Sequence, residues 1–587
     1  MPTTKTEIRA GAYYDSIVLM QLQRALIDLP GVEDAGVVMG TPANKALLEE
    51  GGLLPPEAQQ ARPDDLILVV KAESEQAAQA ALAQVDDLIA ARRSTASSQT
   101  FRPRSLESAA KALPQADLVL VSVPGRYAAG VARQALELGK HVFLYSDNVS
   151  LEDEIALKQT AREQGLLVMG PDCGTAIVHG VGLGFANRVR RGPIGLVAAA
   201  GTGLQAVSAA IHNLGSGVSQ AIGTGGRDLK AEVGGITALQ GLALLAADPD
   251  TQVIVLVSKP PAPPVAARLL AAAQTCGKPV VVNFIGYPPP ARRLGNVWFA
   301  VNLQETAEIS VQCAEDSSQY SVDSSQYSGD SGQYSGDGGQ RSLNTDHRLT
   351  EHWLRGLFSG GTLALEAVLA LQNVLHPLYT NVPITAEQRL DNPFQSRAHT
   401  IVDLGEDAFT QGRLHPMLDN DLRIRRLRQE ATDPAVGVIL LDVVLGEGAH
   451  PDPAGELAPV IRQIIAERKT KSEERNIEVY AIVIGTEDDP QDLNDQVSKL
   501  EEAGAKVFPN IPAAVAHLLS RSPAPTPPPS PLPTIHAPLT AINVGLESFF
   551  DSLTAQGAKA VHVEWRPPAG GDERLAGILA RLSKLGN

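Results

Sequence analysis

Cysteine is scarce in this sequence. The 587 residues include three cysteines, Cys173, Cys276 and Cys313, and none of them forms a CxxC pair. An odd and scattered set of this kind excludes a disulfide framework and a cysteine-rich metal site, and it is typical of a reducing compartment. Cys173 stands in the loop-like motif GPDCG, where a small buried residue is favoured over a catalytic thiolate.

Positive charge and long apolar runs are also limited. Lys and Arg number 49 against 66 Asp and Glu, so the net charge is −17, and no basic block is long enough to follow a nucleic-acid backbone. The uncharged stretch from Gly192 to Ile211 is rich in Gly, Ala, Ser and Thr, which favours a strand, a turn and a helix over a membrane span. The N-terminal residues do not resemble a secretion signal. We therefore expect a cytoplasmic protein that binds neither nucleic acid nor membrane.

What the sequence does contain is a glycine turn between an apolar run and an Ala-rich segment. Residues 194–199 are apolar, Gly201-Thr202-Gly203 follows, and the helical composition then extends to Leu214. Glycines allow backbone N–H groups to approach an anion, and a helix N-terminus leaves such groups unpaired, so this turn predicts a phosphate cradle. A second turn, 223–226, would join the same pocket at one end of a parallel sheet. A plain connection without a ligand is the alternative.

The pattern recurs later in the chain. GLFSGGTLALEAVLAL places Gly360-Gly361-Thr362 after another apolar run, and ADPDTQVIVLV from Ala247 is echoed by TDPAVGVILL from Thr432. The sequence therefore predicts two copies of one domain. Either copy, or both, could provide the phosphate site.

Several motifs together resemble the FdrA family, which is related to the ligase domains of succinyl-CoA synthetases. They are DSIVLMQLQ, VVMGTPANK, GPDCGTAI, VDLGEDAFT and LLDVVLGEGAHPDP. The resemblance covers roughly residues 8 to 515 and implies an α/β fold. It implies a Rossmann-like CoA-binding-type domain and two flavodoxin-like parallel-sheet domains of the succinyl-CoA synthetase type, after a small α+β domain. The alternation of apolar strands and helices from residue 117 onward agrees with this fold.

On this basis we expect seven segments. These are a small α+β domain (1–95), the Rossmann-like CoA-binding-type domain (105–190), a first ligase-type domain (192–312), a disordered polar heptapeptide linker (313–349), a second ligase-type domain (350–520), a Pro-rich linker (521–534) and a tail (535–587). The tail resembles the beginning of the partner subunit usually encoded beside FdrA. It is too short to hold a core of its own, so it should pack on another surface.

The candidate site residues lie in the glycine turns and in loops after predicted strands. The phosphate- and substrate-binding candidates are Gly201, Thr202, Gly203, Gly225, Gly226, Gly360, Gly361, Thr362, Arg126, Asn148, Asp172, Cys173 and Gly174. Arg227 or Lys259 would neutralise the phosphate, while Arg126 and Asn148 would orient a carboxylate substrate. No metal site is expected from ligand spacing. The loop cluster Asp403, Glu406 and Asp407 suits either Mg²⁺ with a phosphate or a helix cap.

Two departures from the synthetase pattern bear on function. Asn296 stands where synthetases of this kind carry their phosphorylated histidine, and an amide cannot carry a phosphoryl group. The extra Gly-rich strand–turn–helix unit that touches CoA in those enzymes is not found before residue 105. Both departures argue against CoA as a cofactor and against the full synthetase reaction.

The resemblance implies a subunit of an oxamate carbamoyltransferase of allantoin (purine) catabolism, which converts oxalurate and phosphate to oxamate and carbamoyl phosphate. Carbamoyl phosphate is a mixed anhydride whose phosphate suits paired helix N-termini. The alternatives are a subunit of an NDP-forming acyl-CoA synthetase and a non-catalytic scaffold for partner subunits. In each case we expect an oligomer with FdrA-type partner subunits.

Overall fold

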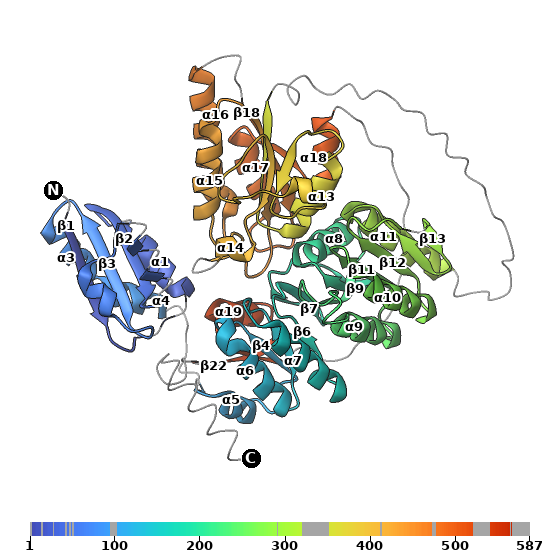
Figure 1. Cartoon of the computed structure of the whole chain (residues 1–587). Helices are drawn as coiled ribbons and strands as arrows, with labels where there is room; N and C mark the ends of the chain where they lie inside the picture. The colour runs from blue at the N-terminus through green and yellow to red at the C-terminus, as the bar shows by residue number, and fades with distance from the viewer. Residues whose placement is uncertain are drawn as a thin grey trace.

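The protein is described by a computed structural model. It describes residues 3–93 except 13, 15, 28, 42–43, 46–47 and 50–51, residues 103–319 except 290, residues 352–471 except 411–413, residues 477–519, and residues 540–565 except 564. The N-terminal domain stands to one side of three α/β units (Figure 1). The heptapeptide repeat from residue 320 and the Pro-rich linker lie outside the described residues.

The N-terminal domain is a three-stranded antiparallel sheet in the order β1-β3-β2, covered by helices. Its central strand, LILVVKA, is buried along almost its whole length because both neighbouring strands and the helices cover it. The elements are β1 (Thr3–Arg9), α1 (Ser16–Ile27), β2 (Val32–Met39), η1 (Pro56–Gln60), β3 (Leu66–Ala72), α3 (Glu75–Ala83) and α4 (Val85–Arg93). The expected small α+β unit is confirmed.

The Rossmann-like unit has a five-stranded parallel sheet in the order β22-β21-β4-β5-β6. Two of these strands come from the C-terminal tail, which Figure 1 shows in red beside the blue strand β4. The prediction that the tail packs on another surface is therefore confirmed. The elements are α5 (Leu106–Ala112), β4 (Leu118–Val121), α6 (Gly125–Glu137), β5 (His141–Leu144), α7 (Leu151–Glu163), β6 (Val168–Met169), β21 (Thr540–Val544), α19 (Glu547–Ala555) and β22 (Lys559–Val563).

The first ligase-type domain contains an eight-stranded sheet in the order β13-β14-β12-β11-β9-β10-β7-β8. Its parallel part, β10-β9-β11-β12-β14, has the flavodoxin-like order 2-1-3-4-5. The elements are β7 (Thr175–Val178), β8 (Val181–Gly184), β9 (Arg191–Ala199), α8 (Gly201–Asn213), β10 (Val218–Gly223), α9 (Ile236–Ala247), β11 (Val253–Ser258), α10 (Pro263–Thr275), β12 (Val280–Phe284), β13 (Arg293–Leu294), β14 (Val297–Phe299) and α11 (Leu303–Gln319).

Both expected boundaries of this domain are displaced in the structure. The hairpin β7–β8, expected in the Rossmann-like unit, pairs antiparallel with β10 and covers that edge of the sheet. Helix α11 continues to Gln319, past the expected end at Gln312, because its inward face packs against α8 and the sheet. Residues 313–319, which we expected to belong to the linker, are therefore part of this helix.

The second ligase-type domain has a six-stranded, fully parallel sheet in the order β16-β17-β15-β18-β19-β20. Strands β17-β15-β18-β19-β20 repeat the order of the first domain, which confirms the duplication. The elements are β15 (Trp353–Phe358), α13 (Gly361–Leu371), β16 (Leu378–Thr380), η3 (Ala386–Gln388), β17 (His399–Asp403), α14 (Asp407–Thr410), α15 (Asp421–Thr432), β18 (Val436–Val444), α16 (Pro453–Lys471), β19 (Glu478–Ile484), α17 (Leu493–Glu502), β20 (Lys506–Phe508) and α18 (Ile511–Leu518).

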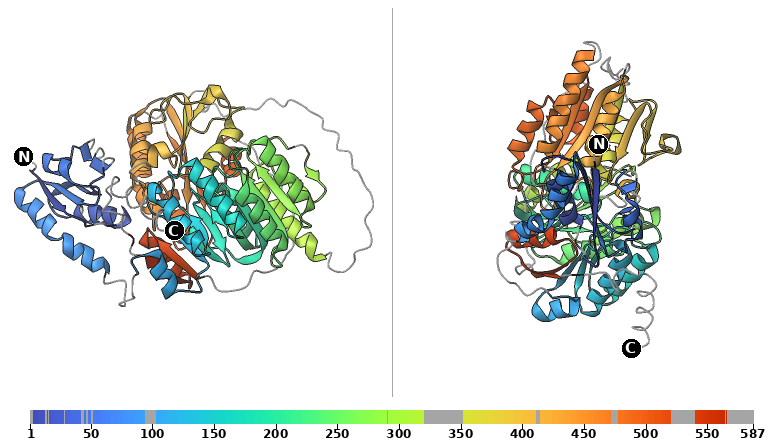
Figure 2. Two further views of the ribbon diagram at one scale, coloured as in Figure 1. Left: turned by 60° about the horizontal axis from the view of Figure 1, so that its bottom comes forward. Right: turned by 90° about the vertical axis from the view of Figure 1, so that its left-hand side faces the viewer.

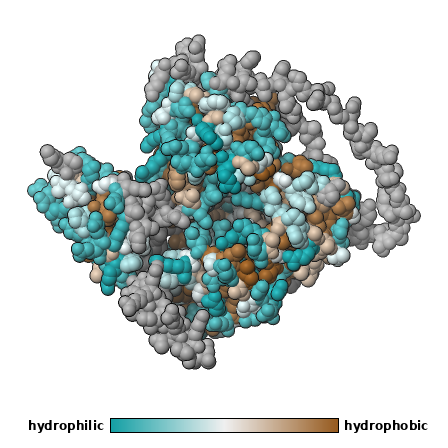
Figure 3. Space-filling view, in the orientation of Figure 1, coloured by the Kyte–Doolittle hydropathy of each residue, from teal (hydrophilic) through white to brown (hydrophobic). Residues whose placement is uncertain are grey.

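The two copies pack on each other through α8 and α13, and the left view in Figure 2 shows the yellow-to-orange second copy against the green first copy. Leu204 and Val207 of α8 share one buried cluster with Leu363 and Val368 of α13, so one hydrophobic core runs through both domains. On the face drawn in Figure 3, hydrophilic residues cover most of the N-terminal domain and of the second copy. No helix among the described residues is long and apolar enough to span a bilayer.

Candidate functional site

A cavity of about 690 Å³ lies where the three parallel sheets meet. Most of its walls are the loops that follow β4, β5, β6, β9, β10, β11, β15, β17 and β21, and residues of α1 and β2 in the N-terminal domain also line it. Ligands of open parallel sheets bind beyond the carboxyl ends of the strands, and a volume of this size suits a small metabolite. The cavity is therefore the main candidate site among the described residues.

Two helix N-termini converge on the cavity. Helix α8 begins at Gly201 after Ala200, helix α13 begins at Gly361 after Gly360, and neither first turn has a side-chain cap. The first intrahelical hydrogen bonds are donated by residues 204 and 364, so the preceding N–H groups have no partner within their helices. Gly201, Thr202, Gly360, Gly361 and Thr362 all line the cavity. The two predicted cradles therefore line one cavity together, with helix N–H groups that have no partner within their own helices.

Glycine at these turns permits the close contact between the copies. A Cβ on Gly360 would collide with the side chain of Thr202, and a Cβ on Gly203 would lie 2.9 Å from Cγ2 of Thr362. Gly203 does not line the cavity. It allows the two helices to approach each other, which differs from the ligand role that we predicted for it.

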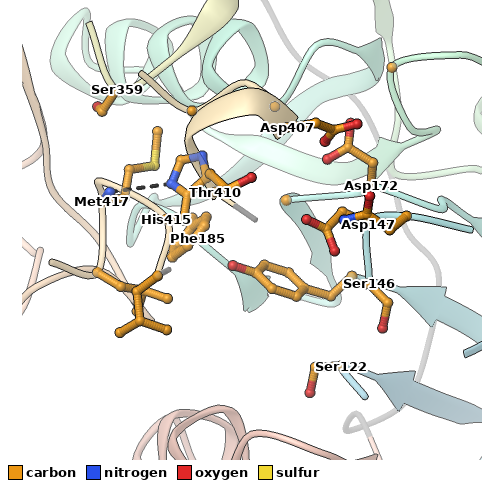
Figure 4. Close-up of a pocket in the computed structure, with 18 of the residues that line it drawn as sticks. Ser122, Ser146, Asp147, Asp172, Phe185, Ser359, Asp407, Thr410, His415 and Met417 are labelled. Atoms are coloured by element: carbon orange, nitrogen blue, oxygen red, sulfur yellow. Dashed lines mark hydrogen bonds between the residues drawn. The ribbon is translucent and has the colours of Figure 1, made fainter. Parts of the chain in front are cut away.

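Carboxyl groups also line the cavity. Asp147, Asp172 and Asp407 lie together in Figure 4, from the Rossmann-like unit and the second copy. Asp172 lines the cavity and is exposed to solvent there. Desolvation by the surrounding protein, with the charges of Asp147 and Asp407, raises its pKa to about 7. Burial also raises the pKa of Asp403, at the end of β17, to about 6. These groups can therefore carry protons near neutral pH.

Lys259 supplies positive charge to this cavity. It follows β11, is half-buried, and has no carboxylate within ion-pair distance among the described residues. A Cβ on Gly361 would lie 2.7 Å from its Nζ and would collide with Asp403, so the ammonium group sits at the start of α13. The charge of Lys259 opposes the rise in the pKa of Asp172 and Asp403. Its placement fits the predicted neutralisation of an anion.

Arg227, the other cation candidate, is placed outside the cavity lining. Its Nε donates to Oε2 of Glu154 at 2.9 Å, and its Nη2 donates to the carbonyl of Val149 at 2.8 Å. Glu154 also accepts from the fully buried Lys158, which binds Asp228 at 2.7 Å. This network joins the Rossmann-like unit to the first copy. Arg227 acts on the cavity only at a distance, by lowering the pKa of Asp172.

The remaining predicted residues divide into two groups. Asn148, Asp172, Gly174 and Gly226 line the cavity. Arg126, Cys173 and Gly225 do not. Arg126 is exposed, and its guanidinium lies 4.9 Å from the centroid of the Tyr127 ring. Gly225 packs with a φ of 83° against residues 170–171.

Cys173 is 2 % exposed, and burial raises the pKa of its thiol to about 12. A thiol of this kind carries no thiolate at neutral pH. The structure therefore favours the small buried loop residue over the catalytic thiolate.

Asn296 is placed in the turn between β13 and β14, away from the cavity. Its amide donates to the carbonyls of Ala273 and Lys278 at 2.8 and 2.7 Å. The residue therefore holds the turn together.

His415 lines the cavity and was not selected from the sequence. Burial and the charge of Arg423 lower the pKa of its imidazole to about 4. Its Nδ1 accepts a hydrogen bond from the Met417 N–H at 3.2 Å, which places the proton of the neutral ring on Nε2. Figure 4 shows the ring beside Phe185. Its position within the motif that begins VDLGEDAFT was the only available signal.

Gln205 and Ser359 also line the cavity and were not predicted. The amide nitrogen and oxygen of Gln205 have no hydrogen-bond partner among the described residues, although the residue is 1 % exposed. Ser359 donates through its N–H and its hydroxyl to the buried Asp442, at 2.8 and 2.9 Å. The unpaired amide of Gln205 is unusual, because a buried amide normally has a partner.

At the rim, Asn44 lines the cavity, but Lys45 donates to the carbonyl of Gln59 at 2.9 Å and serves its own domain. For residues 403, 406 and 407, Mg²⁺ with a phosphate and helix capping were both open; Asp403 and Asp407 line the cavity. Asp403 accepts from the N–H of Gly405, and Glu406 accepts from Asn381. No three His, Cys, Asp or Glu side chains within the described ranges are arranged to hold a metal ion.

Three family models match this sequence. They are the AllF heavy metal-associated domain over residues 1–104, the CoA binding domain over residues 190–286 and the CoA-ligase model over residues 357–518. The last two fall on the two flavodoxin-like copies. The residues that we expected to form the CoA-binding-type domain, 105–190, lie before the second match. Residues 1–104 contain neither cysteine nor histidine, so the usual soft metal ligands are absent from that stretch.

Among curated proteins, YahF of Escherichia coli (strain K12) is 41% identical over 506 residues, which covers 86% of this chain and 95% of YahF. The alpha 1 subunit of the ADP-forming succinate–CoA ligase of Archaeoglobus fulgidus is 28% identical over 188 residues, covering 31% of this chain and 62% of that protein. A solved structure of acetyl-coenzyme A synthetase 1 from Ca. Korarchaeum cryptofilum covers 69% of this chain and 82% of its own, at 16% identity and a TM-score of 0.28. That score is too low for an argument about geometry.

Proposed function

Because this chain belongs to the FdrA family, we propose that it is a carbamoyltransferase subunit of the oxamate carbamoyltransferase type, which converts oxalurate and phosphate to oxamate and carbamoyl phosphate. One observation supports the proposal most. The uncapped N-termini of α8 and α13 face one cavity together with Lys259, which has no ion-pair partner among the described residues. Helix N-termini and a lysine together form a site for phosphate.

The reaction needs only groups that this cavity contains. A phosphate oxygen forms a bond to the carbamoyl carbon of oxalurate, and the bond from that carbon to the oxamate nitrogen breaks. The nitrogen gains the proton that the phosphate loses. Asp172 lines the cavity with a pKa of about 7, so it can accept one proton and donate the other. Lys259 and the helix N–H groups would stabilise the charge on the phosphate oxygens.

The unpaired amide of Gln205 supports a substrate with amide groups. Both of its polar atoms lack partners among the described residues, and the side chain lines the cavity beside the start of α8. A carboxamide pairs well with a urea or carbamoyl group, because each offers one N–H donor and one carbonyl acceptor. Oxalurate and oxamate both carry such groups.

His415 favours a second candidate, an acyl-CoA synthetase subunit. Its imidazole is neutral at physiological pH and lines the same cavity. A shift of the ring proton from Nε2 to Nδ1, which would break the hydrogen bond from the Met417 N–H, would make Nε2 a nucleophile that could carry a phosphoryl group in place of the absent histidine at position 296. The CoA-binding and CoA-ligase matches agree with this second candidate.

The deciding experiment mixes the purified chain with its partner proteins, oxalurate and phosphate, and follows carbamoyl phosphate. We expect its formation without CoA or nucleotide. The opposite result would be nucleotide turnover that depends on CoA, with ³²P from the labelled nucleotide retained on the wild-type protein but not on His415→Ala. That result would favour the acyl-CoA synthetase subunit over the carbamoyltransferase. Carbamoyl phosphate formation that is unchanged in Lys259→Met would leave this chain as a scaffold.

Gln205→Leu tests substrate recognition separately. We expect the KM for oxalurate to rise about 10-fold, the effect of losing hydrogen bonds to a buried amide, while the KM for phosphate stays unchanged. Gln240→Leu is the matched control, because Gln240 donates to the carbonyl of Leu166 and does not line the cavity. An equal rise for both substrates in Gln205→Leu would indicate a structural role.

A further inference from the structure

The C-terminal segment, residues 540–565, completes a sheet whose other strands, β4, β5 and β6, lie more than 370 positions earlier. Strand β21 lies between β22 and β4, with residues 541–544 opposite residues 118–121. The N–H of Ser122 donates to the carbonyl of Val544 at 2.9 Å, and the N–H of Leu546 donates to Oγ of Ser122 at 2.9 Å. Without this segment, β4 would be an edge strand with unpaired backbone groups.

The apolar residues of the segment are buried against other parts of the chain. Phe549 is 1 % exposed, and its ring lies 4.7 Å from the Tyr145 ring and 6.4 Å from the Phe185 ring. Leu553 is equally buried, and it belongs to a cluster with residues of β4, β8 and the first copy. A strand–helix–strand of this size cannot bury these side chains on itself. Its surface therefore resembles a subunit interface.

Helix α19 contacts all three α/β units. Phe549 packs on Tyr145 of the Rossmann-like unit, and Gln556 accepts from the N–H of Gly182 in the first copy at 2.9 Å. Ser552 donates to Oε2 of Glu447, after β18 of the second copy, at 2.9 Å. The segment thus joins three units that otherwise meet around the cavity.

The segment also forms part of the cavity wall. Gly545 and Leu546 line the cavity, as do Tyr145 and Phe185, which Phe549 supports. Gly545 has a φ of 121°, and a Cβ there would lie 2.6 Å from the carbonyl carbon of Ser122. Only glycine fits this turn. The strand–glycine turn–helix unit that was not found before residue 105 is therefore supplied by the other end of the chain.

We propose that the surface beneath residues 540–565, formed by the edge of β4 with the adjoining β8 and the loop after β18, is a docking site for a strand–helix–strand of a partner polypeptide. This chain carries such a segment fused to its own end. The partner would present a parallel strand, a glycine turn and an inward phenylalanine on the following helix. The anion cavity is complete only when the segment is docked.

The test uses the full chain with a specific protease site inserted in the Pro-rich stretch, 521–534. After cleavage we expect the C-terminal fragment to co-elute with the rest in native size-exclusion chromatography. A tagged copy of the fragment, added in excess, should exchange into the complex, as read by native mass spectrometry. Unchanged sulfate affinity after the fragment has been removed would overturn the proposal, and so would a complete failure of exchange.

Phe549→Ala and Phe550→Ala form a matched pair for the cleaved protein. Phe549 is buried between the units, whereas the half-buried Phe550 ring lies 5.9 Å from His562 in the same segment. We expect Phe549→Ala to weaken retention of the fragment by about 100-fold or more, and Phe550→Ala to leave it nearly unchanged. Equal retention in both variants would contradict the proposed interface. A different result would be an uncleaved protein that is a dimer and that becomes a monomer without bound fragment after cleavage. That result would show that the segment docks on a second copy, and it would overturn docking within one chain.

Discussion

The two flavodoxin-like copies share a strand order, yet they contribute different chemistry to the cavity. Each begins with a strand that ends in a glycine turn, at Gly201 in the first copy and at Gly361 in the second. The first copy adds the cation Lys259 and the amide Gln205, whereas the second adds Asp403 and His415. The duplication has thus produced one site with two unlike halves.

The surroundings of the two copies explain the difference. The open edge of the first sheet is covered by the hairpin β7–β8, and the Rossmann-like unit packs beside it. The second copy instead extends its sheet with β16 and adds the loop that carries His415. Helix N-termini are retained in both because each is fixed by the strand–turn–helix itself, while the charged residues lie in loops that vary freely.

The largest expected effect is a difference between alanine substitutions at the two glycine turns. A Cβ on Gly361 would collide with Asp403 and lie 2.7 Å from Nζ of Lys259, whereas a Cβ on Gly201 meets only Oγ1 of Thr175, at 3.8 Å. Gly361→Ala should weaken phosphate binding strongly, because the new methyl group would displace the Asp403 carboxylate and the Lys259 ammonium group. The loss of stability should be small, because both groups are the ends of flexible side chains. Gly201→Ala should retain both properties. Isothermal titration with phosphate and thermal unfolding measure this, and equal losses would mean that the copies are equivalent.

Lys259→Met tests whether the cation of the first copy serves the common site. Removal of one charge-assisted hydrogen bond should weaken phosphate binding by about 10- to 100-fold. Lys230→Met is the control, because Lys230 is exposed in the same copy and does not line the cavity. Similar affinities in the two variants would show that the helix N-termini bind phosphate without the lysine.

The pH dependence tests the carboxyl groups that face the two turns. Desolvation by the surrounding protein raises the pKa of Asp172 from 3.8 to about 7, so the folded protein keeps a proton that the unfolded chain has lost. The free energy of unfolding should therefore fall as the pH rises from about 4 to about 7.

Sulfate, which does not titrate in this range, should bind more weakly as Asp172 ionises. Asp172→Asn should remove most of both trends. A sulfate affinity that stays constant from pH 5 to pH 8 in the wild type would contradict a protonated Asp172.

The smallest effect is expected at Cys173. Burial raises the pKa of its thiol to about 12, and its Sγ packs against Gly223 outside the cavity lining. Cys173→Ala should cost about 1 kcal/mol of stability through lost packing and leave phosphate affinity unchanged. Alkylating reagents should modify the half-buried Cys276 first. Rapid loss of activity through labelling of Cys173 would restore the thiolate hypothesis.

The sequence alone determined the elements and their repetition. The apolar runs before Gly201 and Gly361, and the Asp-Pro motifs that precede β11 and β18, predicted two parallel-sheet domains, and the structure has them. Lys259 and Asp172 were also found from the sequence, because both follow apolar strands. Local rules suffice for such features, since strand burial and helix starts depend on neighbouring residues.

Only the tertiary structure decided how these parts combine. The two glycine turns face one cavity because α8 packs on α13, and no local pattern encodes that contact. Arg227 was separated from the cavity by its ion pair with Glu154, while His415 and Gln205 were brought into it by chain packing. The tail supplied the strand beside β4 from the far end of the chain, because pairing of parallel strands depends on proximity in space and not on order in sequence.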